Sequence, residues 1–284
     1  MAGYVLDRAR TGELLKKAGK VVVIGKPQVR NKADGSQVTT DYVVAAVQGI
    51  WQAGLPAELT FRISEGILKE AMQALVPERA RLYAEGKQVL LGTGSICALS
   101  ELESALNMGF DFVVSPADGI GGTHLSMGGS YEDPIRFVQL SRQANVYAAP
   151  AAFSPREVGF YLFRDDGLRP DALKIFNSEV LAADNAKALG GLLAPFARDD
   201  GRYANKGYII MPTGAVNRKT GPTFEDVIRA NGFFPVLGMS DPIEAMKDKA
   251  SRDPAAYATA IQQFILDYSA NLQAFAAAKA AKGK

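Results

Sequence analysis

The sequence predicts an α/β protein of the (β/α)8 or TIM barrel type with an additional helix at its C-terminal end. Short apolar runs rich in β-branched residues alternate eight times with helical patterns along the 284 residues. This alternation is typical of parallel strands that are joined by helices. The length suits one barrel of about 250 residues. The hydrophobic share of 48% suits a compact core.

The eight expected strands are short runs, most of which end before a turn or a loop. In chain order they are "KVVVIG", "PAELTFR", "QVLLGTG", "DFVVSP", "NVYAAP", "DALKIF", "GYIIMPTG" and "FFPVLG". The helices expected between them span 41–53, 65–75, 100–108, 133–142, 155–163, 182–193 and 223–230. Several of these segments have a glycine just beyond their ends, as helix C-termini prefer.

We expect a single domain over residues 1–284. The barrel occupies about 19–240, and the extension 241–284 supplies a closing helix and a further, alanine-rich helix. A doubly wound open sheet is the structural alternative, because it also alternates strands with helices. It usually carries a glycine-rich dinucleotide turn after the first strand, and "VVVIGKPQVRNK" lacks that glycine spacing. The sequence therefore favours the barrel.

Composition points to a small-molecule partner. The 32 basic and 30 acidic residues leave a net charge of +2, too weak a field to predict nucleic-acid or membrane binding. One cysteine, Cys97, fits a reducing compartment, and one histidine, His124, argues against a histidine-rich metal site. We expect no metal and no cofactor. The first residues lack a signal-peptide core, and no apolar run reaches the roughly 20 residues that span a bilayer, so we expect a cytoplasmic protein.

Two long loops interrupt the regular spacing, at 26–41 after the first strand and at 117–134 after the fourth. Both belong to the C-terminal face, where barrel active sites are built, and both are candidate lids. For the second loop a solvated, glycine-rich excursion is an equal alternative, and His124 within it is more typical of a surface residue. Lys26, Arg30 and Lys32 in the first loop are candidate anion contacts, although such residues are more often simply solvated.

The second strand carries an unusual set of polar residues. In "AELTFR" the period of two places Glu58, Thr60 and Arg62 on one face, with Leu59 and Phe61 on the other. If the apolar pair packs under the helices, the polar set faces the lumen. Charged residues are rare at such positions unless they are paired or functional.

The sixth strand places a lysine among apolar residues. Lys174 alternates with Leu173 and Ile175, which predicts that it faces the lumen, because a closed barrel has no edge strand. The alternative is a lysine whose stem reaches to the rim. Burial beside Arg62 lowers the pKa of a lysine, and the free amine can then attack a ketone and form a Schiff base, as in class I aldolases. Glu58 is the natural proton carrier for such a reaction.

Small polar residues and glycines follow several other strands. They are Thr93, Ser95, Ser115, Pro116, Thr213, Gly214, Gly238 and Ser240. The last four follow the seventh and eighth strands, where barrels frequently bind phosphate through backbone N–H groups. Each cluster alone also fits an ordinary turn.

The ordered motifs "ELTFR", "GTGS", "VVSP", "ALKIF", "PTGA" and "VLGMS" resemble those of the 2-keto-3-deoxy-6-phosphogluconate (KDPG) / 4-hydroxy-2-oxoglutarate (KHG) aldolases. These are class I barrels and usually trimers, and the resemblance covers about 21–240. It implies that Lys174 is the Schiff-base lysine and Glu58 the acid/base. The other implied residues are Arg62 and Ser95 for the pyruvyl carboxylate, Pro116 for the pyruvyl pocket, and Thr213, Gly214, Gly238 and Ser240 for the distal phosphate end.

Three departures concern the distal half of the substrate. Asn177 stands where the family has proline, and Ala215 and Met239 stand where it has glycine. A Cβ at the last two positions restricts the approach of the backbone to a phosphate. The aldehyde half and its phosphorylation are therefore left open by the sequence.

The resemblance implies a carbon–carbon lyase that needs no metal. It cleaves or forms a 4-hydroxy-2-oxo acid, giving pyruvate and an aldehyde; the substrate is a 2-keto-3-deoxy sugar acid, with or without a 6-phosphate, or 4-hydroxy-2-oxoglutarate. The expected partner is this small 2-oxo acid, and the expected assembly is a homotrimer. Two alternatives stay open: another Schiff-base lyase or dehydratase on a 2-oxo acid, and a non-catalytic barrel that retains a pyruvate pocket.

Overall fold

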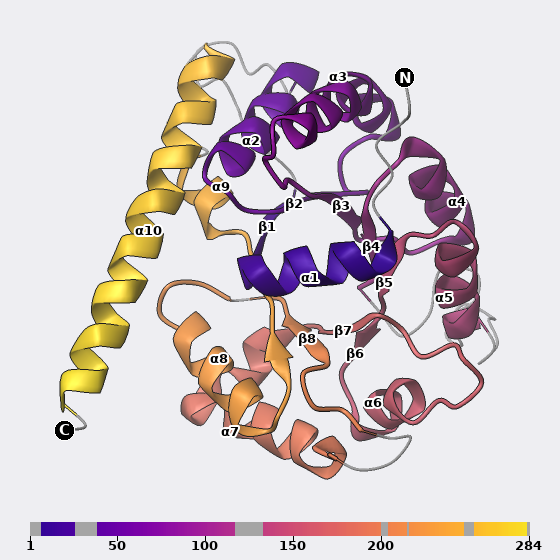
Figure 1. The fold of residues 1–284 in the computed structure, drawn as a ribbon, viewed down its shortest axis with the longest axis vertical. Coiled ribbons are helices and arrows are strands. Elements are labelled where there is room, and N and C mark those ends of the chain that lie inside the picture. The colour runs from indigo at the N-terminus through magenta and orange to yellow at the C-terminus, as the bar shows by residue number, and fades with distance from the viewer. Residues whose placement is uncertain are drawn as a thin grey trace.

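The computed structural model describes residues 7–25, 39–116, 133–199, 204–214, 216–246 and 253–282. The chain forms the expected (β/α)8 barrel, with helices around a ring of strands and a further C-terminal helix (Figure 1). Most of the two expected long loops, 26–38 and 117–132, lies outside the described residues. These loops include Lys26, Arg30, Lys32 and His124, and Ala215 also lies outside the described residues.

All paired strands are parallel, in the order β10-β1-β2-β3-β4-β5 and β6-β7-β8-β9. The strands are β1 (Lys20–Ile24), β2 (Ala57–Thr60), β3 (Leu91–Gly94), β4 (Phe112–Val114), β5 (Tyr147–Ala149), β6 (Ala151–Ala152), β7 (Ala172–Ile175), β8 (Ile209–Pro212), β9 (Phe234–Pro235) and β10 (Leu237–Met239). Each of the eight expected runs contains strand structure.

The fifth barrel strand is broken at Pro150, where the expected run ends, and continues beyond it as β6, and the eighth expected strand is broken at Val236. Backbone bonds continue the ring across both breaks: the Lys174 N–H donates to the Pro150 carbonyl at 2.9 Å, and the Val236 N–H to the Ile210 carbonyl at 3.0 Å. Proline has no N–H to give to a ladder, which accounts for the break at Pro150. The ten segments therefore act as eight barrel strands.

The helices are α1 (Arg8–Ala18), α2 (Thr40–Gln52), α3 (Glu65–Ala84), α4 (Leu99–Met108), α5 (Asp133–Gln143), α6 (Pro155–Leu162), α7 (Ala183–Leu193), α8 (Gly221–Ala230), α9 (Asp241–Met246) and α10 (Pro254–Lys282), with 3-10 turns η2 (Ser178–Leu181) and η3 (Ala194–Phe196). The end expected for α3 at 75 is wrong, since this helix continues through Pro77. Buried Leu82 and the ion pair of Arg79 with Asp111, at 2.9 Å, hold its second half against the barrel.

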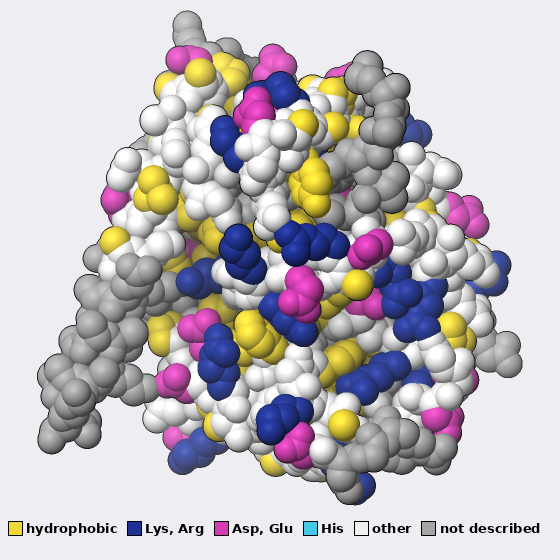
Figure 2. Space-filling model, in the orientation of Figure 1, with side chains coloured by type: hydrophobic (Ala, Val, Ile, Leu, Met, Phe, Trp, Pro, Cys, Tyr) yellow, Lys and Arg dark blue, Asp and Glu magenta, His cyan; other side chains and the backbone are white. Residues whose placement is uncertain are grey.

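Helix α1 closes the N-terminal end of the barrel. The Asp7 carboxylate caps it by accepting from the Arg10 N–H at 2.7 Å, and Gly19 ends it with a φ of 64°. Leu14 and Leu15 on its inner side join the core inside the barrel. Figure 1 shows α1 lying across the middle of the ring, and Figure 2 shows basic and acidic side chains interspersed on this face. The lumen is therefore open to chemistry only at its C-terminal end.

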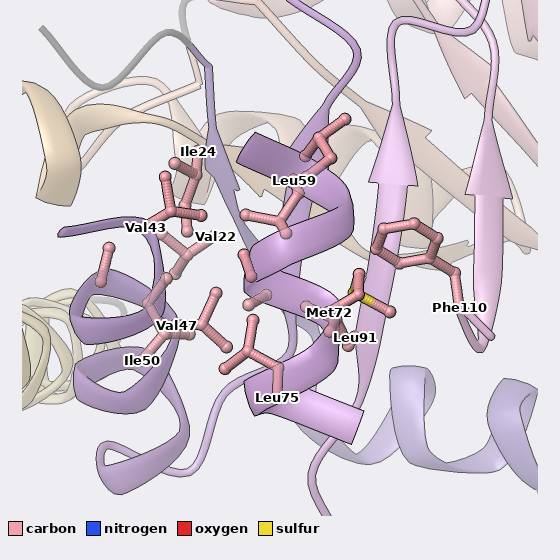
Figure 3. Packing of buried hydrophobic residues seen from close by; sticks show 14 of the residues in the cluster. Val22, Ile24, Val43, Val47, Ile50, Leu59, Met72, Leu75, Leu91 and Phe110 are labelled. Carbon is pink, nitrogen blue, oxygen red and sulfur yellow. The ribbon is translucent and has the colours of Figure 1, made fainter. Parts of the chain in front are cut away.

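Alternation along the strands produces an outer and an inner core. Outward-facing residues such as Val22, Leu59 and Leu91 pack under α2 and α3 against Val47 and Leu75 (Figure 3). The inner core fills the lower lumen and includes Val21, Leu90, Phe112, Tyr147, Ala172, Ile209, Met211 and Val236. Above this apolar plug the lumen carries polar residues.

Helix α10 packs along α2 at one side of the ring (Figure 1). The two backbones approach so closely that a Cβ added to Gly49 would lie 2.4 Å from the Ala258 carbonyl oxygen. The Tyr42 and Tyr257 rings meet edge to face there, with centroids 5.7 Å apart. Within the described ranges, no helix combines the length and apolar character that crossing a bilayer requires.

Candidate active site

Glu58 on β2 and Lys174 on β7 are both buried and point into the upper lumen. Glu58 stands beside Val23 and Gly92 in register, and Lys174 stands beside Met211 and Ala151. Their strand neighbours Leu59, Leu173 and Ile175 belong to the outer core, as the pleat requires. The structure thus brings the two residues into one compartment.

Burial shifts the pKa values of this pair toward their neutral forms. Burial raises the pKa of the Glu58 carboxyl, and the positive charges of Lys174 and Arg62 oppose that rise. Burial lowers the pKa of the Lys174 amine, the Glu58 charge opposes the fall, and the like charge of Arg62 adds to it. A buried amine with a lowered pKa is a competent nucleophile at neutral pH.

Two glycines on β3 make room for side chains in the lumen. A Cβ at Gly94 would stand 2.0 Å from Glu58 Oε1, and a Cβ at Gly92 would stand 2.1 Å from the Phe112 ring. Gly94 therefore lets the Glu58 carboxyl lie flat against the next strand. Sequence reasoning missed this function, although a glycine inside a strand is a signal for close approach. Thr93, between the two glycines, faces away from the lumen toward the helices.

Arg62 lies at the mouth of the lumen rather than on a strand. The expectation that β2 continues through Arg62 is wrong, because the Ile63 N–H turns back to the Thr60 carbonyl at 2.9 Å. The Thr60 hydroxyl donates to the Gly25 carbonyl at 2.7 Å at the same level. The Arg62 side chain is exposed and its guanidinium lies against Gly25, where an added Cβ would be 2.9 Å from Nη2. A fixed cation therefore stands at the rim beside the buried pair.

Ser95 and Pro116 follow β3 and β4 at the same end of the barrel. Ser95 is half-buried and has a φ of 57°, a conformation that is uncommon for a residue with a side chain. Pro116 lines a cavity of about 400 Å³ together with Phe176, whose ring centroid lies 4.8 Å from Lys174 Nζ. Both residues thus lie at the same rim as the Lys174 compartment.

The distal group gathers Thr213, Gly214 and Gly238 at the ends of β8 and β10. Thr213 and Gly238 form a bridge, and a Cβ on Gly238 would be 2.6 Å from Thr213 Oγ1. The Thr213 N–H already donates to the Ile175 carbonyl and to Ser178 Oγ, both at 3.0 Å. This N–H is therefore committed to the fold.

Gly214 has a φ of 94°. A Cβ added to Gly214 would lie only 2.0 Å from the side-chain oxygen of Asn177. The same oxygen accepts from the Glu179 N–H at 3.1 Å and starts η2. Ser240 lies two residues after Gly238, before α9, and its carbonyl accepts from the N–H groups of Ile243 and Glu244. Asn177 therefore covers the glycine that the sequence motifs associate with phosphate.

The described part of the chain contains no cluster of three or more His, Cys, Asp or Glu side chains placed to hold a metal ion. Cys97 is exposed on the segment after β3, and its thiol and the Lys174 amine influence each other's pKa.

Comparison with known proteins finds no matching family model and no matching curated protein. Solved structures do match. The KDPG aldolase of Legionella pneumophila, captured with pyruvate as a covalent carbinolamine, is 16% identical with a TM-score of 0.54, over 89% of this chain and 96% of that one. The 2-keto-3-deoxy-6-phosphogluconate aldolase of Zymomonas mobilis is 16% identical with a TM-score of 0.53, over 90% and 95%. The fold is that of these aldolase barrels.

A third similar structure is the YdjI aldolase of Escherichia coli, 8% identical with a TM-score of 0.57, over 94% of this chain and 96% of that one. At these identities the likeness establishes the fold. The KDPG aldolases among the neighbours agree with the family that the sequence motifs resemble.

Proposed function

We propose that the protein is a class I aldolase that cleaves or forms a 4-hydroxy-2-oxo acid, with pyruvate and an aldehyde as the other reactants. The observation that carries this proposal is the buried Lys174 amine, which shares the upper lumen with the buried Glu58 carboxyl. A barrel needs neither group for stability at that depth, because burying an ionisable group costs free energy. Their pairing at the C-terminal end is the arrangement that imine chemistry requires.

Imine formation begins at Lys174. Its neutral amine attacks the C2 carbonyl of the 2-oxo acid, and the resulting carbinolamine loses water with a proton supplied by Glu58. The ionised Glu58 then accepts the proton of the C4 hydroxyl. The C3–C4 bond breaks, its electron pair forms the enamine, and the aldehyde leaves.

The second half returns the enzyme to its starting state. Glu58 gives its proton to C3 of the enamine, which becomes the protonated imine of pyruvate. Water then hydrolyses that imine to pyruvate and the free amine, and Glu58 takes up the proton that this step releases. One carboxyl therefore donates and accepts a proton twice in each cycle. The pKa of Glu58, which burial raises above its ordinary value, suits a group that must both hold and release a proton.

The carboxylate of the 2-oxo acid needs a cation at the rim, and Arg62 supplies it. A guanidinium can bind a carboxylate through two parallel N–H bonds. The Ser95 hydroxyl adds a donor from the end of β3. Together they orient C2 toward Lys174.

Pyruvate release from synthetic 4-hydroxy-2-oxo acids tests this function. The wild type should release pyruvate at the same rate with and without a metal chelator. Lys174→Met should lower kcat on the order of a thousandfold or more, as loss of a covalent nucleophile does. Lys187→Met changes an exposed lysine on α7 and serves as the matched control. Full turnover by Lys174→Met would overturn the proposal.

The family resemblance further implies a homotrimer. Light scattering of the purified chain measures this directly, and a mass of three chains is the expected result.

A further inference from the structure

The cavity beside Lys174 gathers the exposed apolar side chains of the described structure. Its lining residues are Pro116, Ala151, Ala152, Phe153, Glu157, Phe176, Asn177 and Val180. Four large hydrophobic side chains are exposed in the described part of the chain: Phe153 (43%), Phe176 (37%), Val180 (62%) and Leu266 (44%). Three of these four line this one cavity. Apolar groups that gather at a concave site indicate a ligand surface.

The cavity adjoins the proposed imine site. Its Phe176 ring lies 4.8 Å from Lys174 Nζ, and its Ala151 stands beside Lys174 in the register of β6 and β7. A substrate joined to Nζ therefore meets the Phe176 ring first. The remaining apolar side chains continue outward from the ends of β6 and β7.

Charge in the cavity disfavours an anion. Among the described residues that line it, Glu157 is the one that carries a charge, and its carboxylate accepts from the N–H groups of Phe153 at 2.6 Å and Ser154 at 2.9 Å. These bonds fix the position of the carboxylate at the start of α6. A phosphate or carboxylate on the substrate would meet like charge there, whereas an apolar group would not.

The residues that the sequence motifs associate with phosphate already make contacts within this chain. The Asn177 oxygen stands against Gly214, and the Thr213 N–H is bonded to Ile175 and Ser178. The side of Gly214 and the Thr213 N–H are therefore both occupied by contacts within this chain.

We propose that the part of this cavity formed by Phe153, Phe176 and Val180 binds an apolar substituent on C4 of the substrate, beyond the pyruvyl group that the family resemblance places against Pro116, so that the aldehyde half is an uncharged aromatic or branched aliphatic aldehyde. This inference rests on the proposed aldolase function. Phe153, Phe176 and Val180 contact the substituent, and Glu157 excludes anionic aldehydes.

Condensation of pyruvate with a panel of aldehydes tests the inference. Benzaldehyde and 2-methylpropanal represent the apolar class, and glyceraldehyde 3-phosphate and glyoxylate represent the anionic class. For the wild type, kcat/KM should be at least about tenfold higher for the apolar class, since pocket contacts of this size discriminate by roughly 10–200-fold. Phe153→Ala should lower that preference about tenfold, and Val180→Lys should shift it toward the anionic class. Leu266→Ala, an exposed apolar residue on α10, should leave the preference unchanged.

Borohydride trapping of pyruvate alone, without any aldehyde, separates the two levels of failure. Absence of a trapped adduct on the wild type would overturn the aldolase function and this inference with it. An adduct together with a preference for anionic aldehydes, or a preference that Phe153→Ala and Val180→Lys leave unaltered, would overturn the inference alone.

Discussion

The Glu58 carboxyl lies against the Cα of Gly94, so that a Cβ on Gly94 would stand 2.0 Å from Oε1. This contact joins adjacent strands, β2 and β3, at the level of the Lys174 amine. Because glycine has no Cβ, the carboxyl of Glu58, the proposed acid/base, can occupy this position. Gly94 is accordingly a positioning residue rather than a catalytic one.

Gly94→Ala should slow both steps that use Glu58, imine formation and carbon–carbon cleavage. The added methyl displaces the Glu58 carboxyl, and a displacement of about 1 Å can cost on the order of a hundredfold in kcat. The adduct between Lys174 and pyruvate should form more slowly but still on Lys174, because the nucleophile itself is unchanged. The acid limb of the pH profile should also move to lower pH, because a carboxyl pushed toward solvent recovers its ordinary pKa. Gly66→Ala on α3, where the new methyl meets open space, is the control. Wild-type kcat in Gly94→Ala would refute the positioning argument.

The pH dependence of kcat should report Glu58. Burial raises the pKa of this carboxyl above its ordinary value of 4.5. In the imine complex, whose ionisation kcat reports, Glu58 must be ionised to accept the C4 hydroxyl proton, so the rate should fall as pH decreases through the raised pKa, and the acid limb should lie above pH 4.5. Glu58→Gln should abolish that limb together with most turnover. A wild-type limb at or below 4.5 would show that the carboxyl is not buried during catalysis.

The same shift predicts a change in stability. A carboxyl with a raised pKa binds its proton more tightly in the folded state, so the free energy of unfolding should decrease as pH rises from about 4.5 through the raised pKa. Glu58→Gln should flatten this dependence. Urea titrations of both proteins across that range measure it, and parallel curves for the two proteins would contradict the assignment.

Replacement of Arg62 should affect pyruvate binding and the basicity of Lys174 together. Arg62→Met removes the proposed carboxylate contact, which should raise KM for the 2-oxo acid by about tenfold or more. It also removes a like charge that lowers the pKa of Lys174, so imine formation should require higher pH. Arg229→Met on α8 should change neither quantity. An unaltered KM and an unaltered pH dependence in Arg62→Met would place the carboxylate elsewhere.

Close packing of α2 against α10 predicts that substitutions there change the free energy of unfolding and leave catalysis unchanged. Gly49→Ala places a methyl 2.4 Å from the Ala258 carbonyl oxygen and should lower the free energy of unfolding by about 1–3 kcal/mol. Gly191→Ala on α7, where the new methyl meets open space, should instead be neutral or stabilising by up to about 1 kcal/mol. Equal stability of the two variants would show that α10 does not pack closely on α2.

Alternation of apolar runs predicted every barrel strand, because each run is buried on both faces of a closed sheet. The same reasoning missed α1. Its Asp7 cap and Gly19 stop are visible in the sequence, but none of the eight expected strand runs precedes it, and only Leu14 and Leu15 mark its apolar side. The barrel repeat therefore gave no reason to look for a helix there.

The sequence likewise predicted the candidate site only in part. The period of two oriented Glu58 and Lys174 correctly, since both lie well inside their strands. It could not say that β2 ends at Thr60, because a turn bond from Ile63 ends the strand. Phe153, Phe176 and Val180 meet at one cavity because the segments that carry them follow neighbouring strands of the barrel. A local sequence pattern does not show which strands are neighbours.

The central claim is a covalent bond between pyruvate and Lys174, and borohydride reduction followed by peptide mass mapping tests it most directly. The wild type should carry a reduced pyruvyl adduct on the peptide that contains Lys174, and Lys174→Met should carry none while it unfolds at least as cooperatively as the wild type. An adduct on another lysine, or no adduct at saturating pyruvate, would contradict the account.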